Sequence, residues 1–381
     1  MRVHRYSCGS LKRSLGMVAV MMAMVAVATG TTSTSNATDD VLLGYFGPAA
    51  PNHPQGGDLW CAACLALEKA NAAGGCHGRP FRLVASWSAN PWGTGVADVA
   101  RLAYIDQVWA IIAGFDGASV HLAEQIVAKA RLVLMNAAAT DKSINMASVP
   151  WMFSSAPLDD AQAAVLAEAI AAEVQTRSFA VVSAIDHDSH AFTVELLKAL
   201  KERALAPAFH FDCEPAQPTT RSVLERVQRS NAAAVVLIAG AADTAQLLRT
   251  LRDVGCEAAV FGGPWMSRRA FVEQAGVLAE GVKFPYLLAP SPKFAEFAQR
   301  FTQRFGRGPD YAAAHMYDTV SLLVAAIRQA GLDRTGIQGA VRELSPWSGV
   351  TGEIRWDTVG ANCRPVRMGT INAAGQIIED R

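Results

Sequence analysis

The sequence has little charge and no excess of either sign. Only 18% of its 381 residues are charged, and 34 basic side chains balance 34 acidic ones. Because both signs are interspersed after the N-terminus, no basic stripe is available to hold phosphate groups, and we predict no nucleic-acid partner. Hydrophobic residues make up 51% of the chain, and its length suits two domains of ordinary size with substantial cores.

The sequence also lacks the short motifs that identify common enzymes. No Gly-x-Ser-x-Gly elbow, phosphate-binding loop or zinc-protease helix motif is present. Gly93-Thr-Gly95 lacks the third glycine of a dinucleotide fingerprint and does not follow a strand. A hydrolase using Asp186 and His190 is the alternative, but the sequence places no nucleophile beside them. We therefore predict a protein that is not an enzyme and that needs no cofactor.

The N-terminal hydrophobic run is too short for an ordinary membrane span. Leu15–Ala28 carries no charge but has 14 residues, against about 20 for a spanning helix. Four basic residues precede it and small polar residues follow, which is the pattern of a secretory signal. We predict a signal peptide over residues 1–37, cleaved near Ala37, and a periplasmic or other extracytoplasmic location. An uncleaved N-terminal anchor is the alternative. Cleavage would leave 30 basic and 34 acidic side chains, a net charge of −4.

Cysteine is too scattered for a disulfide framework. Of seven cysteines, Cys8 lies in the predicted signal, and the other six show no regular spacing. Cys61 and Cys64 share one apolar face of an Ala/Leu-rich helix, where cysteine behaves as a small hydrophobic residue, so we expect them in a core. The alternatives are a redox pair, or a zinc set completed by Cys76 and His77.

Short β-rich runs alternate with Ala/Leu-rich helices over the rest of the chain. The first series has predicted strands at 41–46, 81–87, 109–114 and 132–136, with helices at 60–73, 95–105 and 119–130. The second has strands at 179–184, 208–211, 233–238 and 258–262, with helices at 192–203, 223–230 and 245–254. A strand after Gly281, helices at 294–305 and 312–330, and strands near 352–356 and 367–372 follow. Continuous apolar strands between helices predict an α/β protein with two doubly wound parallel sheets. Ligands of such sheets bind at the carboxyl ends of the strands.

Five segments, in this order and spacing, resemble type I periplasmic solute-binding proteins of the branched-chain amino acid and amide receptor family, which includes leucine-binding proteins. They are Leu65–Gly75, Gly114–Ala123, Asn136–Thr140, Ala313–Asp318 and Gly352–Asp357. The resemblance spans about residues 41–375. It implies two lobes joined by a three-strand hinge, the first formed by 40–155 plus 286–350 and the second by 156–285 plus 351–381. It also implies a monomer that closes by hinge bending around an amino acid, amide or related organic acid and delivers it to the membrane permease of an ABC transporter.

The start of the helix near Ser119 is the predicted carboxylate site. Gly117, Ala118 and Ser119 should leave backbone N–H groups unpaired at the positive end of the helix dipole. The resemblance implies that the Ala138–Thr140 segment contributes to the same site, and it aligns the family's serine with Ala118. The alternative is that the Ser119 and Thr140 side chains only cap turns.

Recognition of an amino group is where the sequence departs from the resemblance. The acidic residue expected after Gly262-Gly263 is replaced by Pro264-Trp265, and the expected tyrosine-glycine pair by Asp188-Ser189-His190. Asp116 from the first lobe, and Asp186 and His190 from the second, are the candidate polar contacts. Trp92 and Trp265 lie in loops that should reach the cleft as aromatic walls, with hinge packing as the alternative.

Two further possibilities remain open. His187, Asp188 and His190 lie within one loop without a fourth ligand at a familiar spacing, so the sequence predicts no metal site. His53 and His121 are expected at the surface or the cleft edge. A ligand-sensing regulatory subunit of the same fold is the alternative to a transport receptor.

Overall fold

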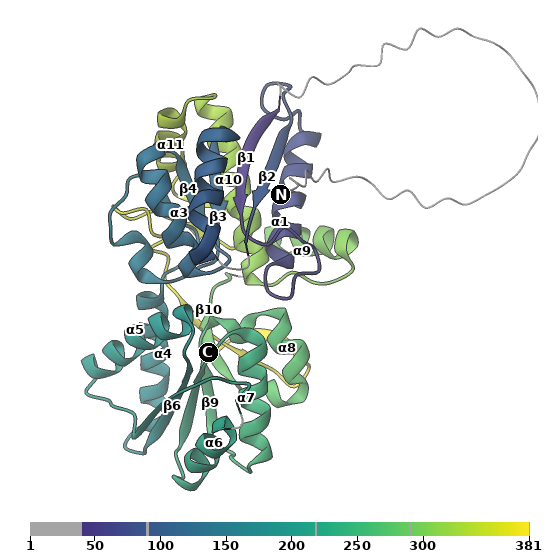
Figure 1. Ribbon diagram of the computed structural model, residues 1–381. Coiled ribbons are helices and arrows are strands. Elements are labelled where there is room, and N and C mark those ends of the chain that lie inside the picture. The colour runs from purple at the N-terminus through teal and green to yellow at the C-terminus, as the bar shows by residue number, and fades with distance from the viewer. Residues whose placement is uncertain (1–39, 89–90, 218, 290, 381) are drawn as a thin grey trace, which may run out of the picture.

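The computed structural model describes residues 40–88, 91–217, 219–289 and 291–380, which form two lobes, one above the other in Figure 1. The first lobe contains a five-stranded parallel sheet with the order β2-β1-β3-β4-β5. Its strands are β1 (Val41–Phe46), β2 (Phe81–Ser86), β3 (Ala110–Ala113), β4 (Val133–Asn136) and β5 (Met152–Ser154).

The second lobe contains a seven-stranded sheet with the order β14-β13-β10-β9-β8-β6-β7. The strands are β6 (Phe179–Ala184), β7 (Phe209–Cys213), β8 (Ala234–Ile238), β9 (Ala259–Gly262), β10 (Lys283–Tyr286), β13 (Arg367–Ile371) and β14 (Ile377–Glu379). β6 to β10 pair in parallel, whereas β13 and β14 extend the sheet antiparallel. A separate two-stranded ladder joins β11 (Trp347–Ser348) and β12 (Glu353–Ile354).

Helices cover both faces of each sheet, as Figure 1 shows. The first lobe carries α1 (Gly57–Ala72), the helical segment Pro91–Ile105 that includes α2 (Val96–Ala100), α3 (Gly117–Ala130), the short η3 (Lys142–Asn145), α9 (Pro292–Phe305), α10 (Tyr311–Ala330) and α11 (Arg334–Glu343). The second carries α4 (Asp159–Val174), α5 (His187–Glu202), α6 (Thr219–Arg229), α7 (Ala241–Asp253), the short η4 (Pro264–Ser267), α8 (Arg269–Ala275) and the short η5 (Gly276–Ala279). Within the described residues, no helix combines the length and apolar character needed to span a bilayer.

Each sheet is buried on both faces, which explains why its central strands read as unbroken apolar runs. Every residue of β3, β4, β6 and β8 is buried. Alternate residues of each sheet point to opposite faces and belong to different hydrophobic clusters, two in each lobe. The prediction of two doubly wound parallel sheets is therefore confirmed.

The chain passes between the lobes three times: after β5, after β10 and before β13. The residue limits predicted for the lobes, 40–155 plus 286–350 and 156–285 plus 351–381, stay our proposal for the domain boundaries. Several elements were not predicted from the sequence, namely β5, α4, α8, α11, β11, β14 and the short helices η3, η4 and η5. The helix predicted to begin at Phe192 begins at His187, because the side chain of Asp186 accepts a hydrogen bond from Ser189 N and caps an additional turn.

Cys61 and Cys76 lie in the main cluster of the first lobe, as core packing requires. Burial raises the pKa of the Cys61 thiol to about 11, although the Arg307 guanidinium nearby acts in the opposite direction. A thiol with a raised pKa is a poor nucleophile and a poor metal ligand at neutral pH. Cys61 therefore acts as a small core residue.

A buried histidine lies where the chain leaves the second lobe. His315 of α10 is fully buried, and its Nε2 lies 3.0 Å from the carbonyl oxygen of Leu287. Burial, with a smaller contribution from the charge of Arg364, lowers the pKa of His315 to about 3. The folded protein therefore keeps this imidazole neutral at every physiological pH.

We expect His315 to make the protein sensitive to acid. Below pH about 6.5 this histidine binds a proton in the unfolded chain but not in the folded chain. Stability is then lost as pH falls towards 3, by about 1.4 kcal/mol per pH unit from this residue. His315→Gln keeps a hydrogen-bond donor near Leu287. Between pH 7 and pH 5 its free energy of unfolding should fall by about 2 kcal/mol less than that of the wild type. Urea unfolding at both pH values measures the difference, and equal losses would contradict the assignment.

Candidate functional site

The lobes touch where the parallel strands of both sheets end, which is the position at which open sheets bind ligands. α3 follows β3 in the first lobe, and α5 follows β6 in the second. Both helices begin with an aspartate cap: Asp116 accepts from Ser119 N at 2.7 Å, and Asp186 accepts from Ser189 N at 3.0 Å. These two helix starts face each other across the boundary between the lobes.

The first amide of α3 is engaged from the opposite lobe. Gly117 N donates to Oδ1 of Asp188, at a distance of 2.9 Å. The sequence predicted that this N–H would be unpaired, and the structure corrects that prediction, because a carboxylate of the protein itself already occupies the position. The contact shows that the start of α3 holds a carboxylate and that a group of the second lobe reaches it.

Protein packed around the Asp188 carboxylate raises its pKa to about 7. The negative charges of Asp116 and Asp186 act in the same direction, whereas the hydrogen bond from Gly117 opposes them. Burial and the neighbouring negative charges make it unfavourable for Asp188 to lose its proton. A cationic group placed beside Asp188 would therefore stabilise its charged form.

A second enclosed acid, which sequence reasoning missed, is the first residue of α4. Asp159 is 2% exposed, and its backbone N–H donates to the carbonyl oxygen of Thr140 at 2.8 Å. Its carboxylate faces the Thr140 hydroxyl, but Oδ1 has no hydrogen-bond partner. Burial raises the pKa of Asp159 well above its ordinary value, and the charge of Asp188 adds to the shift. A buried acid, Asp159, and a half-buried one, Asp188, thus lie close together near the start of α3.

Aromatic side chains form one side of the first-lobe surface at these strand ends. Phe46, Trp87, Phe115 and His53 contact one another edge to face in that order, with ring centroids 5.3, 5.3 and 5.5 Å apart. Trp87, Phe115 and His53 are half-buried and come from the ends of three neighbouring strands. They form an apolar wall of the kind that solute pockets use.

The roles of Trp92 and Trp265 as walls of the cleft stay predictions. Trp265 packs on Phe192 inside the second lobe, with ring centroids 5.5 Å apart, and the side chain of Trp92 lies outside the described part of the chain. Trp60 and Trp151 pack against the main cluster of the first lobe.

The remaining predicted contact residues divide by exposure. Asp186 and His190 are exposed at the start of α5. Ala118 and Ser119 are buried, and the Ser119 hydroxyl donates to the backbone oxygen of Asp116 at 3.0 Å. Ala138 is half-buried, and Thr140 is buried beside Asp159.

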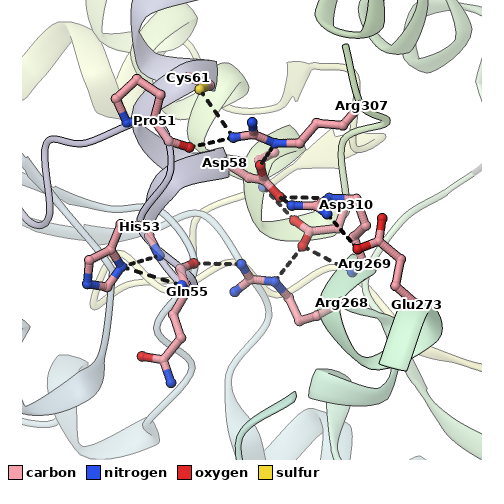
Figure 2. Close-up of polar contacts among 12 residues, drawn as sticks. Pro51, His53, Gln55, Asp58, Cys61, Arg268, Arg269, Glu273, Arg307 and Asp310 are labelled. Carbon is pink, nitrogen blue, oxygen red and sulfur yellow. Dashed lines mark hydrogen bonds and ion pairs between the residues drawn. The ribbon is translucent and has the colours of Figure 1, made fainter. Parts of the chain in front are cut away.

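A cluster of ion pairs joins the lobes at a second place (Figure 2). Arg268 Nε lies 2.5 Å from Asp310 Oδ2, and Arg269 Nη2 lies 3.0 Å from Asp58 Oδ2. Arg307 Nε also contacts Asp58, at 2.6 Å from Oδ1. Asp58 and Asp310 are buried at the starts of α1 and α10, where the helix dipole favours negative charge. The two arginines of the second lobe therefore bind helix starts of the first.

Two hollows on the surface include neither the start of α3 nor that of α5. One is lined by residues of β10, β13 and β14, and the other surrounds Tyr104, Trp109 and Arg334 of the first lobe. Neither brings together enclosed acids or helix starts from both lobes. The interlobe position therefore remains the candidate site.

Comparison with known proteins gives a consistent result. A sequence model of the family described as "Periplasmic binding protein" matches residues 41–376. A comparison with curated proteins gives no match.

Several solved structures share the two-lobed arrangement. The substrate-binding protein LivJ of the branched-chain amino acid transporter from Streptococcus pneumoniae, solved with isoleucine, is 17% identical, with a TM-score of 0.79 over 90% of this chain and 100% of that one. The leucine-binding protein LivK of Thermotoga maritima is 18% identical, with a TM-score of 0.80 over 90% and 98%. A solute-binding protein of an ABC transporter from R. palustris, solved with benzoate, is 13% identical, with a TM-score of 0.78 over 89% and 95%. At these identities the similarity establishes the fold.

Proposed function

We propose that this chain, which belongs to the family of periplasmic binding proteins, captures a small solute between its lobes and delivers it to the membrane permease of an ABC transporter. Membership of the family implies export and a role in binding rather than in catalysis. We further propose that a signal peptide is removed near Ala37, that the mature receptor is a monomer, and that it catalyses no reaction.

The contact between Asp188 and Gly117 carries the proposal for the site. It joins the two lobes at the carboxyl ends of their strands, and it fills a helix start with a carboxylate. A solute that bound here would touch both lobes, and binding would favour their closure because only the closed arrangement supplies both sets of contacts.

We propose that the solute carries an amino group as well as a carboxylate. Asp159 and Asp188 are enclosed acids whose pKa values are raised, so an ammonium group beside them would gain a strong electrostatic interaction. The carboxylate of the solute would take the place of Asp188 on Gly117 N, which would release Asp188 to accept the ammonium group. Trp87 and Phe115 would contact an apolar side chain. Two of the similar structures hold isoleucine and benzoate, and the two enclosed acids favour the first kind of solute.

A thermal-shift screen tests this proposal. Amino acids with apolar or aromatic side chains should raise the melting temperature, since a ligand at about a hundredfold its Kd stabilises the folded state by about 2.7 kcal/mol. Their deaminated acids should give little shift, because they would place an anion beside two enclosed acids. Equal shifts from both series would contradict the proposed amino-group site, and no shift from any solute would contradict the receptor function.

Asp159→Asn should lower affinity for the best amino acid by about tenfold, the equivalent of 1.4 kcal/mol. Glu168→Gln is the matched control, because Glu168 lies in the same helix but is exposed and pairs with Arg203 of the same lobe, at 3.8 Å. Isothermal titration of both variants measures the effect. Equal affinities of the two variants would remove Asp159 from the site.

A further inference from the structure

Two histidines and an aspartate meet at the boundary between the lobes, beside the candidate solute site. His121 lies on α3, Asp141 immediately precedes η3, and His187 is the first residue of α5 in the second lobe. The Nε2 atoms of both histidines lie 2.9 Å from the same atom, Asp141 Oδ2. Within the described ranges, these residues form a group whose ligand atoms all lie within 4.8 Å of one another.

The spacing of these atoms suits a divalent transition-metal ion. Zinc binds histidine nitrogen and carboxylate oxygen at about 2.0–2.2 Å, so neighbouring ligand atoms are about 3 Å apart around it. Two imidazole nitrogens and one carboxylate oxygen form a donor set for zinc or a neighbouring transition metal, not for calcium or magnesium, which prefer oxygen alone. The side chains of His121 and His187 are 24% and 41% exposed, which leaves a route from solvent.

Surrounding groups hold two of the three ligands, Asp141 and His121, in orientation. Asp141 Oδ1 accepts hydrogen bonds from Ser143 N and Ser143 Oγ, both at 2.8 Å, which leaves Oδ2 directed at the histidines. On the other side of the His121 ring, Glu124 Oε2 lies 3.8 Å from Nδ1. Glu124 is 7% exposed, and its Oε1 has no hydrogen-bond partner. A carboxylate behind the imidazole is the usual arrangement around a metal-binding histidine, because it fixes the ring with Nε2 towards the metal.

We infer that His121, Asp141 and His187 bind a divalent transition-metal ion of the zinc class between the two lobes. The loop considered from the sequence as a metal site contributes only His187, since Asp188 binds Gly117 and His190 does not belong to the group of clustered ligand atoms. Two ligands come from the first lobe and one from the second, so the set is complete only when the lobes are closed. The ion therefore stabilises the closed arrangement, and by linkage it strengthens solute binding.

Zinc titration of the purified chain, after removal of metal with EDTA, tests the site directly. Isothermal titration should show one zinc ion per chain, and His187→Ala and His121→Ala should each weaken binding by about tenfold or more. The matched control is His210→Ala in the second lobe, since His210 also lies beside a carboxylate, at 3.3 Å from Asp212, but belongs to no three-ligand group among the residues that the structure describes. This variant should bind zinc as the wild type does. Circular dichroism of the metal-free variants verifies that each remains folded.

Absence of saturable zinc binding, or equal binding by the wild type and His187→Ala, would overturn the inference. If zinc bound to one isolated surface histidine, only one of the two variants would lose zinc binding. The proposed site requires that both His121→Ala in the first lobe and His187→Ala in the second weaken zinc binding. The titration contains no solute, so failure of the solute screen leaves its result intact. Solution scattering then measures the effect on closure: zinc should decrease the radius of gyration of the wild type and leave that of His187→Ala unchanged.

Discussion

Replacement of Gly117 by valine is expected to abolish solute binding while both lobes remain folded. A Cβ atom at this position would lie 2.7 Å from Asp188 Oδ1 and 3.2 Å from His187 Cδ2, both in the second lobe, and 3.1 Å from Asp141 Cβ. The branched side chain would therefore hold the lobes apart at the place where they must meet around a solute. We expect a loss of at least a hundredfold in affinity, or about 2.7 kcal/mol, and a smaller loss for Gly117→Ala, whose nearest contact is the end of a movable side chain.

Isothermal titration with the best amino acid of the screen measures this loss. Gly339→Val is the matched control: Gly339 lies in α11 of the same lobe, and a Cβ atom there meets nothing within 4 Å. The control should bind as the wild type does. In solution scattering with solute present, Gly117→Val should keep a larger radius of gyration than the wild type. Unaltered affinity in Gly117→Val would place the site away from the start of α3.

Asp310→Ala is expected to cause the largest loss of stability, about 3 kcal/mol or more. Asp310 caps α10 by accepting from Ala313 N at 3.1 Å, and it pairs with Arg268 of the second lobe. Its removal eliminates the cap, which contributes about 1 kcal/mol. It also leaves the Arg268 guanidinium, which is only 15% exposed, without a carboxylate partner. Breaking a buried pair from one side typically costs about 3–5 kcal/mol. The carbonyl oxygen of Gln55, which accepts from Arg268 at 2.8 Å, offsets part of this cost.

Two variants separate the cap from the ion pair. Asp310→Asn retains a side chain that caps helices well but loses the charge. It should therefore show most of the loss of stability expected for Asp310→Ala. Asp333→Ala removes the cap of α11, where Asp333 is exposed and accepts from Gly336 N, and it should cost only about 1 kcal/mol. Urea unfolding is the suitable measurement because urea does not screen charges. Equal losses in Asp310→Ala and Asp333→Ala would show that the pair with Arg268 adds nothing to stability.

Contacts of the protein itself join the lobes at several places: Asp188 with Gly117, the ion pairs of Arg268 and Arg269, the group that includes His187, and the pairs of Lys142 with Asp160 and Glu195. A solute changes the balance between open and closed forms only by the free energy that it gains in the closed form. Because the protein's own contacts favour the closed form, the solute has to supply less interaction energy to close the lobes. Variants that weaken those contacts should therefore weaken solute binding as well.

Much of the fold could be predicted because local sequence and tertiary structure agree. The apolar runs at 179–184 and 233–238 coincide with the buried strands β6 and β8, and Tyr311–Ala330 is helical almost as predicted. Asp159–Val174 was not predicted, although its alanine-rich sequence favours a helix, because alanines lie on all sides of it and obscure the 3.6-residue period. β14 is three residues long and depends on pairing with β13, so its local sequence carries little signal.

The candidate site could be predicted only in part, because its decisive contacts join residues that are distant in sequence. Gly117 was singled out correctly as the start of a helix, but its partner Asp188 lies 71 residues further along the chain. His121 and His187 meet through Asp141 for the same reason. Asp159 follows a proline-containing loop and carries no motif. The aspartate caps at 116 and 186 fit the usual N-cap signature and could have been recognised as caps from the sequence.

The most direct test of the account is a crystal structure of the chain grown with the solute that raises its melting temperature most. We expect electron density for that solute between the lobes, with its carboxylate on Gly117 N and its amino group beside Asp159 and Asp188. Density on the outer surface of either lobe, or a solute that touches one lobe alone, would contradict it.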